Sequence, residues 1–449
     1  MGAEASVVAS AEARALLVLA LPLALQQFGF QLMGTVDAAW LGRYDDTALA
    51  AAGVGNNLLF AITSIGLGLV MGLDTVIPQA IGGGRYPEAR RYLHAGLRLA
   101  VLVGLGCMLL VCATPIVLDL AGVADDVALD ARIYIYVRAL GIVPFLLSVA
   151  YRSYLAAHNV TRPLVIAVVV GNLVNAGLDW LLVPPLGVAG AAIATVSVQV
   201  MIVFVYEASV RALDPDGPTG PLAPGEASPL PSSTRADLVA ILRYGGPVAG
   251  QLFAEVSIFG VATVIAAHMG TLPAAAHTIA LNLSSITFSV TVGIGSAASV
   301  RVGTAIGAGD TALARRRGVL ALVVGLGVMA SFALLFVAIP GPLARIYTSD
   351  AAVIGAAVPL LMIAALFQLS DGTQAIAAGA LRGLGDTRAT LVGNLIGHYL
   401  VGLPISLGLG FAAAMGAPGL WLGLSAGLTI TALYLVQRFV ARTRTGSPR

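Results

Sequence analysis

Long apolar runs, separated by short polar segments, extend along almost the whole chain. Each run has about 20 residues or more, the length that an α-helix needs to cross the ~30 Å hydrocarbon core of a bilayer. Runs of this length lie near residues 15–41, 48–73, 92–118, 130–156, 163–183, 188–210, 237–269, 274–299, 318–340, 352–381, 389–411 and 418–437. The pattern predicts an all-α integral membrane protein with twelve transmembrane helices.

One polar stretch is much longer than the others and lies between the sixth and seventh runs. Residues 213–234 contain six prolines and several glycines. Such a composition cannot pack a core and is typical of a flexible linker. The linker divides the chain into an N-terminal six-helix lobe, residues 1–212, and a C-terminal six-helix lobe, residues 235–449.

The two halves of the sequence resemble each other. Ala80–Gly84, which is followed by arginines, recurs at an offset of 225 positions as Ala305–Gly309, which is also followed by arginines. Thr161-Arg162 recurs at nearly the same offset as Thr387-Arg388. These matches predict an internal duplication. Because each half has an even number of spans, the two lobes should have the same topology and be pseudo-symmetric around a central cleft.

Composition and charge agree with a membrane protein. Hydrophobic residues make up 58% of the 449 and charged residues only 10%, against about 25% charged in soluble domains. The net charge of +2 is too small and dispersed to indicate binding of nucleic acid. All but four of the 24 basic residues, Arg43, Arg132, Arg138 and Arg345, fall on one side of the predicted topology. The positive-inside rule then places both termini and the linker in the cytoplasm, with the chain spanning the inner or plasma membrane.

Four carboxylates lie inside the predicted spans without an arginine close in sequence. They are Asp37 and Asp179 in the first lobe, and Glu255 and Asp371 in the second. A charge at the bilayer centre costs ~2.5–3.5 kcal/mol, so an intramembrane acid normally faces a cavity, where it binds a proton, a cation or a cationic substrate. The alternative is a hydrogen bond between helices that only fixes their packing.

Polar neighbours add oxygen atoms to the acids of the first lobe. Asn172, Asn175 and Asp179 stand at positions i, i+3 and i+7 and so share one face of the fifth helix. Gln26 and Asp37 nearly share a face of the first helix. The two amides and the carboxylate of the fifth helix form a set of oxygens of the size that binds a cation, and Asp37 is a second titratable group of the same lobe.

The second lobe repeats this arrangement around its own acids. Gln251 precedes Glu255 by one helical turn, and Gln368 and Gln374 stand three residues on either side of Asp371. The eighth helix adds a polar stripe consisting of Thr278, Asn282, Ser285 and Ser289. The predicted substrate-binding residues are Glu255, Asp371, Gln251, Asn282, Ser285 and Gln368. Glu255 and Asp371 are also the alternative place for Na⁺ or proton coupling, whereas the hydroxyl stripe is equally compatible with helix packing.

There is little sign of an enzyme in the sequence. HExxH, CxxC and Walker sequences do not occur, GxSxG occurs only as Gly423–Gly427 inside an apolar run, and the five histidines are scattered along the chain. The chain is therefore expected not to be an enzyme and to need no cofactor.

Three segments carry a resemblance to a known family. LALPLALQQFGFQLMGTVDAAWLG (Leu19–Gly42), GLDTVIPQAIGGGR (Gly72–Arg85) and AAGALRGLGDTR (Ala377–Arg388), on duplicated six-helix lobes, resemble the MATE (multidrug and toxic compound extrusion) transporters. The resemblance covers essentially the whole chain except the linker.

The resemblance also assigns roles to the acids. Glu255 and Asp371 match the acidic pair expected of the NorM-like branch, in which the C-terminal lobe binds cation and drug. Asp37, Asn175 and Asp179 match the N-terminal cation or proton site of the DinF-like and archaeal members. The chain carries both sets, and the Glu255 and Asp371 pair favours the NorM-like branch.

The resemblance implies a secondary active multidrug efflux transporter. Such a protein, acting as a monomer in membrane lipid, exchanges amphipathic, cationic small molecules outward against inward H⁺ or Na⁺ by alternating access. A lipid-linked oligosaccharide flippase of the same superfamily is the alternative, but its pyrophosphate ligand would require an arginine-lined cavity, whereas the intramembrane charges of this chain are acidic. A membrane enzyme or a non-transporting scaffold is a more distant alternative.

Overall fold

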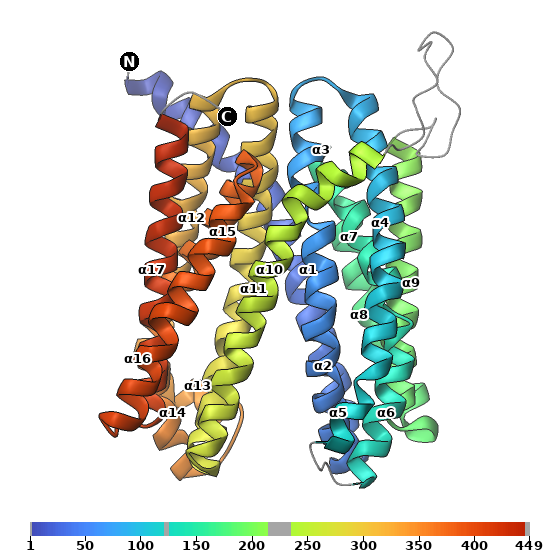
Figure 1. Cartoon of the computed structure of the whole chain (residues 1–449), viewed down its shortest axis with the longest axis vertical. Helices are drawn as coiled ribbons and strands as arrows, with labels where there is room; N and C mark the ends of the chain where they lie inside the picture. Colours follow the sequence, from blue (N-terminus) through green and yellow to red (C-terminus); the bar gives the residue numbers. More distant parts are fainter. Residues whose placement is uncertain (1, 121–124, 214–234, 445–449) are drawn as a thin grey trace. The chain divides into compact units, whose positions relative to one another are not determined.

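The computed structural model describes residues 2–120, 125–213 and 235–444 (Figure 1). Helices make up 92% of the structure, and no strand occurs within those ranges. The all-α fold class predicted from the apolar runs is confirmed. The predicted linker lies outside the described residues, apart from Leu213, which ends a helix.

The helices follow the predicted runs closely. The first half of the chain contains α1 (Gly2–Tyr44), α2 (Asp46–Val70), α3 (Leu73–Gly82), α4 (Tyr86–Ala113), α5 (Pro115–Leu120), α6 (Asp125–Ala139), α7 (Ile142–Ala157), α8 (Arg162–Leu186) and α9 (Val188–Leu213). The second half contains α10 (Arg235–His268), α11 (Thr271–Gly307), α12 (Thr311–Ala338), α13 (Pro340–Arg345), α14 (Ala351–Leu384), α15 (Thr387–Asn394), α16 (Leu403–Leu407) and α17 (Ala417–Arg444), with two π-helical segments, η1 (Leu395–Gly402) and η2 (Gly408–Ala412).

The number of spans agrees with the prediction once one broken helix is counted. Within the described ranges, 11 helices are long and apolar enough to cross a membrane, and α6 with α7 forms a twelfth span bent by 41°. Pro144 lies in the first turn of α7 and has no N–H to donate to the carbonyl of Leu140, so a straight helix cannot continue through this point. The bend therefore has a local cause in the sequence.

The described chain forms two compact units. The N-terminal unit consists of residues 25–249, and the C-terminal unit consists of residues 1–24 and 250–449. The chain passes from one unit to the other inside α1 and again inside α10, and not at the linker. The predicted lobes 1–212 and 235–449 thus describe the sequence repeat, and their boundaries stay a prediction.

The two points at which the chain passes from one unit to the other are related by the offset of the sequence repeat. Residues 24 and 249, the last before each change, are separated by the offset of the repeat. Pro22 and Pro247, which lie inside α1 and α10, are separated by the same offset. Proline inside a helix removes one backbone hydrogen bond and permits a kink. The duplicated prolines therefore lie at equivalent positions, just before each point at which the chain enters the other unit.

Two glycines at the same offset let helices cross very closely. In the N-terminal unit, a methyl group at Gly68 of α2 would lie 2.3 Å from the Cα of Ala249 in α10. In the C-terminal unit, a methyl group at Gly293 of α11 would lie 2.4 Å from the Cα of Ala24 in α1. Small residues at such crossings allow backbones in membranes to approach each other. Both partners of the first crossing recur in the second at the offset of the repeat, so the crossings support an internal duplication.

Each unit has an apolar interior of its own. In the C-terminal unit, the rings of Phe367 and Trp421 lie 5.3 Å apart in a buried cluster that also contains Phe336. Phe367 immediately precedes Gln368, so this cluster fixes the part of α14 that carries the predicted substrate site. Figure 1 shows α12, α14 and α17 of this unit, in yellow to red, running alongside one another.

A buried ion pair accounts for one further acid of the N-terminal unit. Asp74 of α3 lies 3.4 Å from the Nη2 atom of Arg152 in α7 and accepts a hydrogen bond of 2.5 Å from the Ser153 hydroxyl. Removing one partner of a buried pair leaves an uncompensated charge and is strongly destabilising. Asp74 is therefore held as a structural carboxylate that joins α3 to α7.

We predict that Gly68→Ala and Gly293→Ala lower the stability of the protein by about 1–3 kcal/mol, because the added methyl groups would overlap the backbones of Ala249 and Ala24. The measurement is the apparent melting temperature in detergent. Gly53→Ala, on the same helix as Gly68, is the matched control because its methyl group would meet no atom within 4 Å. Equal melting temperatures of Gly68→Ala and Gly53→Ala would show that the close crossing is not needed.

Candidate functional site

The N-terminal unit brings three helices together around Asp37. The Asn175 amide of α8 donates to Asp37 Oδ1 at 3.0 Å, and the Thr195 hydroxyl of α9 donates to Asp37 Oδ2 at 2.6 Å. Both carboxylate oxygens thus have a donor, and Asp37 is buried. The structure brings together the predicted residues Asp37 and Asn175 and holds them in one orientation.

Asp179 completes this cluster and has a different environment. It is fully buried on α8 and interacts electrostatically with Asp37. Neither carboxylate oxygen of Asp179 has a hydrogen-bond donor among the described residues, and the amide oxygen of Asn175 also has none. Two carboxylates side by side repel each other when both are ionised. A proton shared between them or a small cation beside them would remove this repulsion.

The oxygen atoms of this cluster suit a hard monovalent cation. Unpartnered oxygens of Asp179 and Asn175 lie beside Asp37, and carboxylate and amide oxygens are the ligands that hard cations prefer. Within the described ranges, no group of three or more His, Cys, Asp or Glu side chains is placed to hold a metal. A cation at this cluster would therefore depend on amide and hydroxyl oxygens in addition to the two acids.

The sequence did not reveal every residue of the cluster. Thr195 is one of several hydroxyl residues in an apolar helix, and helical spacing relates only residues of the same helix, so nothing in the sequence linked it to Asp37. Gln26 instead donates to the Tyr206 hydroxyl at 2.7 Å, and Asn172 donates to the carbonyl oxygens of Gly29 and Val168. Both amides therefore fix helix packing in this structure.

The C-terminal unit contains the second acidic pair. Glu255 of α10 and Asp371 of α14 are both buried and interact electrostatically. The Gln374 amide donates to Glu255 Oε2 at 3.5 Å, and Gln251 interacts with the same carboxylate from one turn earlier. The predicted combination of two acids and flanking glutamines is thus present in one place. The guanidinium group of Arg382 in α14 also interacts electrostatically with the Glu255 carboxylate.

Gln368 joins this region to α11. Its Oε1 atom accepts a hydrogen bond of 2.7 Å from the Thr287 hydroxyl, and its Nε2 atom has no acceptor among the described residues. The Oε1 atoms of Gln251 and Gln374 are also buried without a donor in the part of the chain that the structure describes. These groups supply one donor and two acceptors that a bound ligand can satisfy.

The predicted polar stripe on α11 is arranged differently. Asn282 is exposed, and the Ser285 hydroxyl donates to the Leu281 carbonyl of its own helix. Ser289 is the one buried member of the predicted stripe, and the other buried polar side chains of α11 in this region, which include Ser284, Thr287 and Thr291, belong to another stripe. Successive residues of an α-helix are rotated by about 100° around its axis, so one helix can carry two polar stripes on different faces. Spacing alone could not tell which of the two points inward. Substrate binding by Asn282 and Ser285 stays a prediction.

A buried histidine lies near the second acidic pair. His398 is 1% exposed, and neither ring nitrogen has a hydrogen-bond partner within the described residues. Its ring centroid lies 6.2 Å from that of Phe259, one turn beyond Glu255 on α10. His398 belongs to η1, and π-helical turns are frequent at functional sites. Its position adds an aromatic and titratable group to this unit.

Comparison with known proteins supports the duplicated organisation of the chain. The MatE family model matches residues 22–181 and 247–407, two segments whose first residues are again separated by the offset of the repeat. The chain is 37% identical over 452 residues to the "Probable multidrug resistance protein NorM" of Deinococcus radiodurans, with 97% of each chain covered. It is 31% identical over 441 residues to the "Multidrug resistance protein NorM" of Vibrio cholerae, with 95% of each chain covered.

Solved structures share the fold. The crystal structure of the eukaryotic MATE transporter AtDTX14 matches with a TM-score of 0.89 at 21% identity and covers 98% of each chain. A MOP superfamily transporter from Pyrococcus furiosus matches with a TM-score of 0.87 at 18% identity, covering 97% of this chain and 96% of that one. The members of the matching family are transporters and not enzymes. The family match, the NorM relatives and the shared fold together establish that this chain belongs to the MatE family of membrane transporters.

Proposed function

We propose that the chain is a multidrug efflux transporter that exports amphipathic, cationic small molecules in exchange for inward H⁺ or Na⁺ by alternating access. The observation that carries this proposal is the pair of interacting, buried carboxylates in each compact unit. Relatives that are named multidrug resistance proteins over nearly the full length support the class of substrate. Both termini are cytoplasmic and the membrane is the inner or plasma membrane in this proposal, with a monomer as the transporting unit.

Coupling is assigned to the cluster of Asp37, Asn175 and Asp179. Since two adjacent acids cannot both stay ionised and unpaired in a buried site, the cluster binds either a proton or Na⁺ when the transporter faces the side of high ion concentration. Asn175 and Thr195 hold Asp37 in place through hydrogen bonds from two other helices. The unpartnered oxygens of Asp179 and Asn175 are the ligands that complete the binding of Na⁺.

Drug recognition is assigned to Glu255 and Asp371. An ionised acid attracts a cationic drug, and the glutamines at 251, 368 and 374 provide unpartnered polar atoms for the uncharged parts of a ligand. Asn282 and Ser285 complete the proposed set on α11. Protons or Na⁺ compete with the drug for Glu255 and Asp371, so this pair is a second place where coupling can occur.

The ion gradients of a cell suffice for this exchange. One positive charge that moves inward across about 100 mV releases about 2.3 kcal/mol. One pH unit adds about 1.4 kcal/mol. With tight coupling, these two contributions sustain a gradient of roughly several hundred-fold for a neutral drug.

The decisive experiment measures ethidium efflux from proteoliposomes under separate Na⁺ and pH gradients. We expect Glu255→Gln and Asp371→Asn to reduce efflux by about tenfold or more under either gradient, because they remove the charge that attracts the cation. Asp37→Asn and Asp179→Asn should abolish the dependence on the driving ion while ethidium still binds. Unchanged efflux in all four variants would refute the assignment, and lipid scrambling without any gradient would indicate a flippase.

A second prediction concerns Thr195. Thr195→Val removes the donor to Asp37 Oδ2, and a hydrogen bond to a charged group contributes about 1.5–3 kcal/mol. The ion concentration that gives half-maximal efflux should therefore shift by about tenfold, at an unchanged affinity for ethidium. Ser197→Ala, on an exposed position of the same helix, is the control and should behave as wild type. An ion dependence of Thr195→Val equal to that of the control would separate Thr195 from coupling.

A further inference from the structure

The first helix of each sequence repeat carries an acidic residue at an equivalent position before its proline. Glu12 of α1 and Asp237 of α10 are separated by the same offset as the prolines and the close helix crossings. Glu12 belongs to the C-terminal unit, whose other members are residues 250–449. Asp237 belongs to the N-terminal unit, residues 25–249. Each acid thus lies in the unit that is built mainly from the other repeat.

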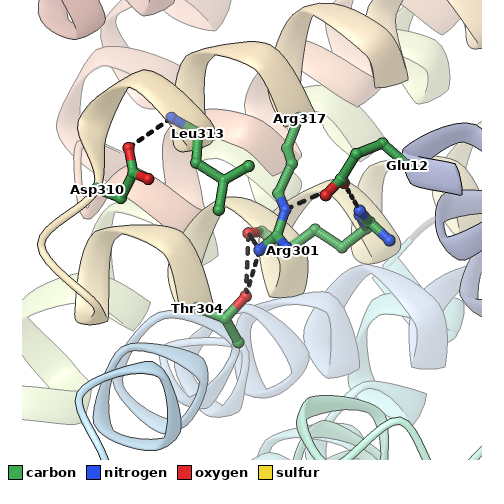
Figure 2. Close-up of polar contacts among 6 residues, drawn as sticks. All are labelled: Glu12, Arg301, Thr304, Asp310, Leu313 and Arg317. Atoms are coloured by element: carbon green, nitrogen blue, oxygen red, sulfur yellow. Dashed lines mark hydrogen bonds and ion pairs between the residues drawn. The ribbon is translucent and has the colours of Figure 1, made fainter. Parts of the chain in front are cut away.

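Two arginines bind Glu12 in the C-terminal unit. Figure 2 shows Arg301 of α11 and Arg317 of α12 converging on its carboxylate, with the Nε atom of Arg317 at 3.3 Å. Arg317 also donates to the carbonyl oxygen of Arg301 at 3.1 Å and to the Thr304 hydroxyl at 3.3 Å. Arg301 is only 8% exposed. A single carboxylate therefore ties the start of α1 to two helices.

The N-terminal unit has a looser counterpart. The Asp237 carboxylate is buried, and its Oδ2 atom lies 3.8 Å from the Nε atom of Arg91 in α4. Under the offset of the repeat, Arg91 corresponds to Arg316, and Tyr92 stands where the second repeat has Arg317. Tyr92 donates to Glu88 of its own helix. The two arginines that bind Glu12 are replaced by Val76 and Tyr92 in the first repeat, so the duplicated contact has kept its acid and takes its arginine from a neighbouring position.

We propose that Glu12 with Arg301 and Arg317, and Asp237 with Arg91, are paired ionic latches that position the first halves of α1 and α10. Each latch lies ten residues before Pro22 or Pro247, so about 15 Å of helix separates it from a proline that permits a kink. Closed latches stabilise the conformation of this structure, and the alternate state of the transport cycle requires them to open. This inference rests on the proposed alternating access.

Hydrogen exchange of the purified full chain tests the latches without any transport. Glu12→Gln should accelerate amide exchange in residues 11–24 by about fivefold, as expected for the loss of a partly buried ion pair, and should leave residues 238–249 unchanged. Asp237→Asn should have the opposite pattern and a smaller effect. Glu207→Gln is the matched control, because its partner Arg211 lies on the same helix and cannot latch another one.

Charge exchange separates a latch from a general loss of stability. Asp237→Arg and Arg91→Asp alone should each accelerate exchange in residues 238–249, and the double variant should restore the slow exchange of the wild type. Acceleration by Glu12→Gln no greater than by Glu207→Gln, or a double variant as fast as the single ones, would overturn the latches. Failure of efflux in the acid variants of the proposed sites would not affect this result, so the two proposals fail separately.

A different observation carries a second inference, which concerns a hollow of about 550 Å³ on the C-terminal unit. The residues around this hollow are Thr311, Ala312, Arg315, Arg316 and Val319 of α12 with Thr443 and Arg444 of α17. No acidic residue is among them. Neighbouring arginines, in contrast, have acidic partners: Glu12 pairs with Arg317, and Asp386 pairs with Arg438 and Arg442. Within the described ranges, Arg315, Arg316 and Arg444 have no ion pair.

An apolar stripe continues from this hollow along α12. Arg316, Val319, Val323 and Leu326 follow one another at spacings of three, four and three residues and so share a helix face. Val323 is 63% exposed and Leu326 is 48% exposed. In a membrane, such exposed apolar side chains contact acyl chains. Three arginines therefore stand at the end of a ridge that lies against lipid.

We infer that the hollow binds the phosphate headgroup of an anionic phospholipid, whose acyl chain lies along Val319, Val323 and Leu326. Arginine recognises phosphate through several N–H groups at once. The first turn of α12 is already capped by the Asp310 carboxylate, which accepts a hydrogen bond from the Leu313 N–H, so recognition of the phosphate rests on the three arginines. The apolar ridge favours a lipid over free phosphate, because free phosphate makes no use of it.

Native mass spectrometry with the full chain in detergent tests this site. Phosphatidylglycerol should bind at least about tenfold more tightly than phosphatidylcholine, and the triple variant Arg315→Ala, Arg316→Ala, Arg444→Ala should lose this preference. Arg345→Ala, which removes an exposed arginine of α13 in the same unit, is the control and should keep it. Competition by millimolar inorganic phosphate, an equal preference in the triple variant, or an equal loss in the control would overturn the lipid site.

Discussion

A carboxylate inside hydrocarbon must be paired, hydrogen-bonded or neutralised, and this constraint explains how the acids of the chain are used. Where an arginine faces the acid, as at Asp74 and Glu12, the contact joins helices and needs no ligand. Where two acids face each other, as Asp37 does with Asp179, neither can neutralise the other. The second arrangement is relieved by a proton or a cation from outside the protein, and the proposed coupling rests on this.

The duplication also determines which helices the two compact units share. Prolines, close glycine crossings and the acids Glu12 and Asp237 all recur at one and the same offset, and both matches to the MatE family begin at the two prolines. The first half of each repeat's first helix therefore belongs to a unit made from the other repeat. A helix that is divided in this way belongs to both units, and α1 and α10 are the two helices with this property.

Helical spacing located the buried acids but not their partners. Asp37 and Asn175 were predicted together because apolar surroundings make polar residues conspicuous, whereas Thr195 was missed because a hydroxyl in a membrane helix is common. On α11 the spacing of Asn282 and Ser285 described a real stripe, yet Thr287 of another stripe faces Gln368. Periodicity defines the faces of a helix and leaves open which face its neighbours cover.

The sequence by itself determined the membrane class, the number and limits of the spans, the duplication and the family. These features follow from local hydrophobicity and from repetition, because backbone hydrogen bonds in lipid must close within each helix. Only the tertiary structure decided that α1 and α10 change units in mid-helix, that Thr195 serves Asp37, and that Asp74 has an arginine partner. Each of these depends on contacts between residues tens to hundreds of positions apart, which no local pattern encodes.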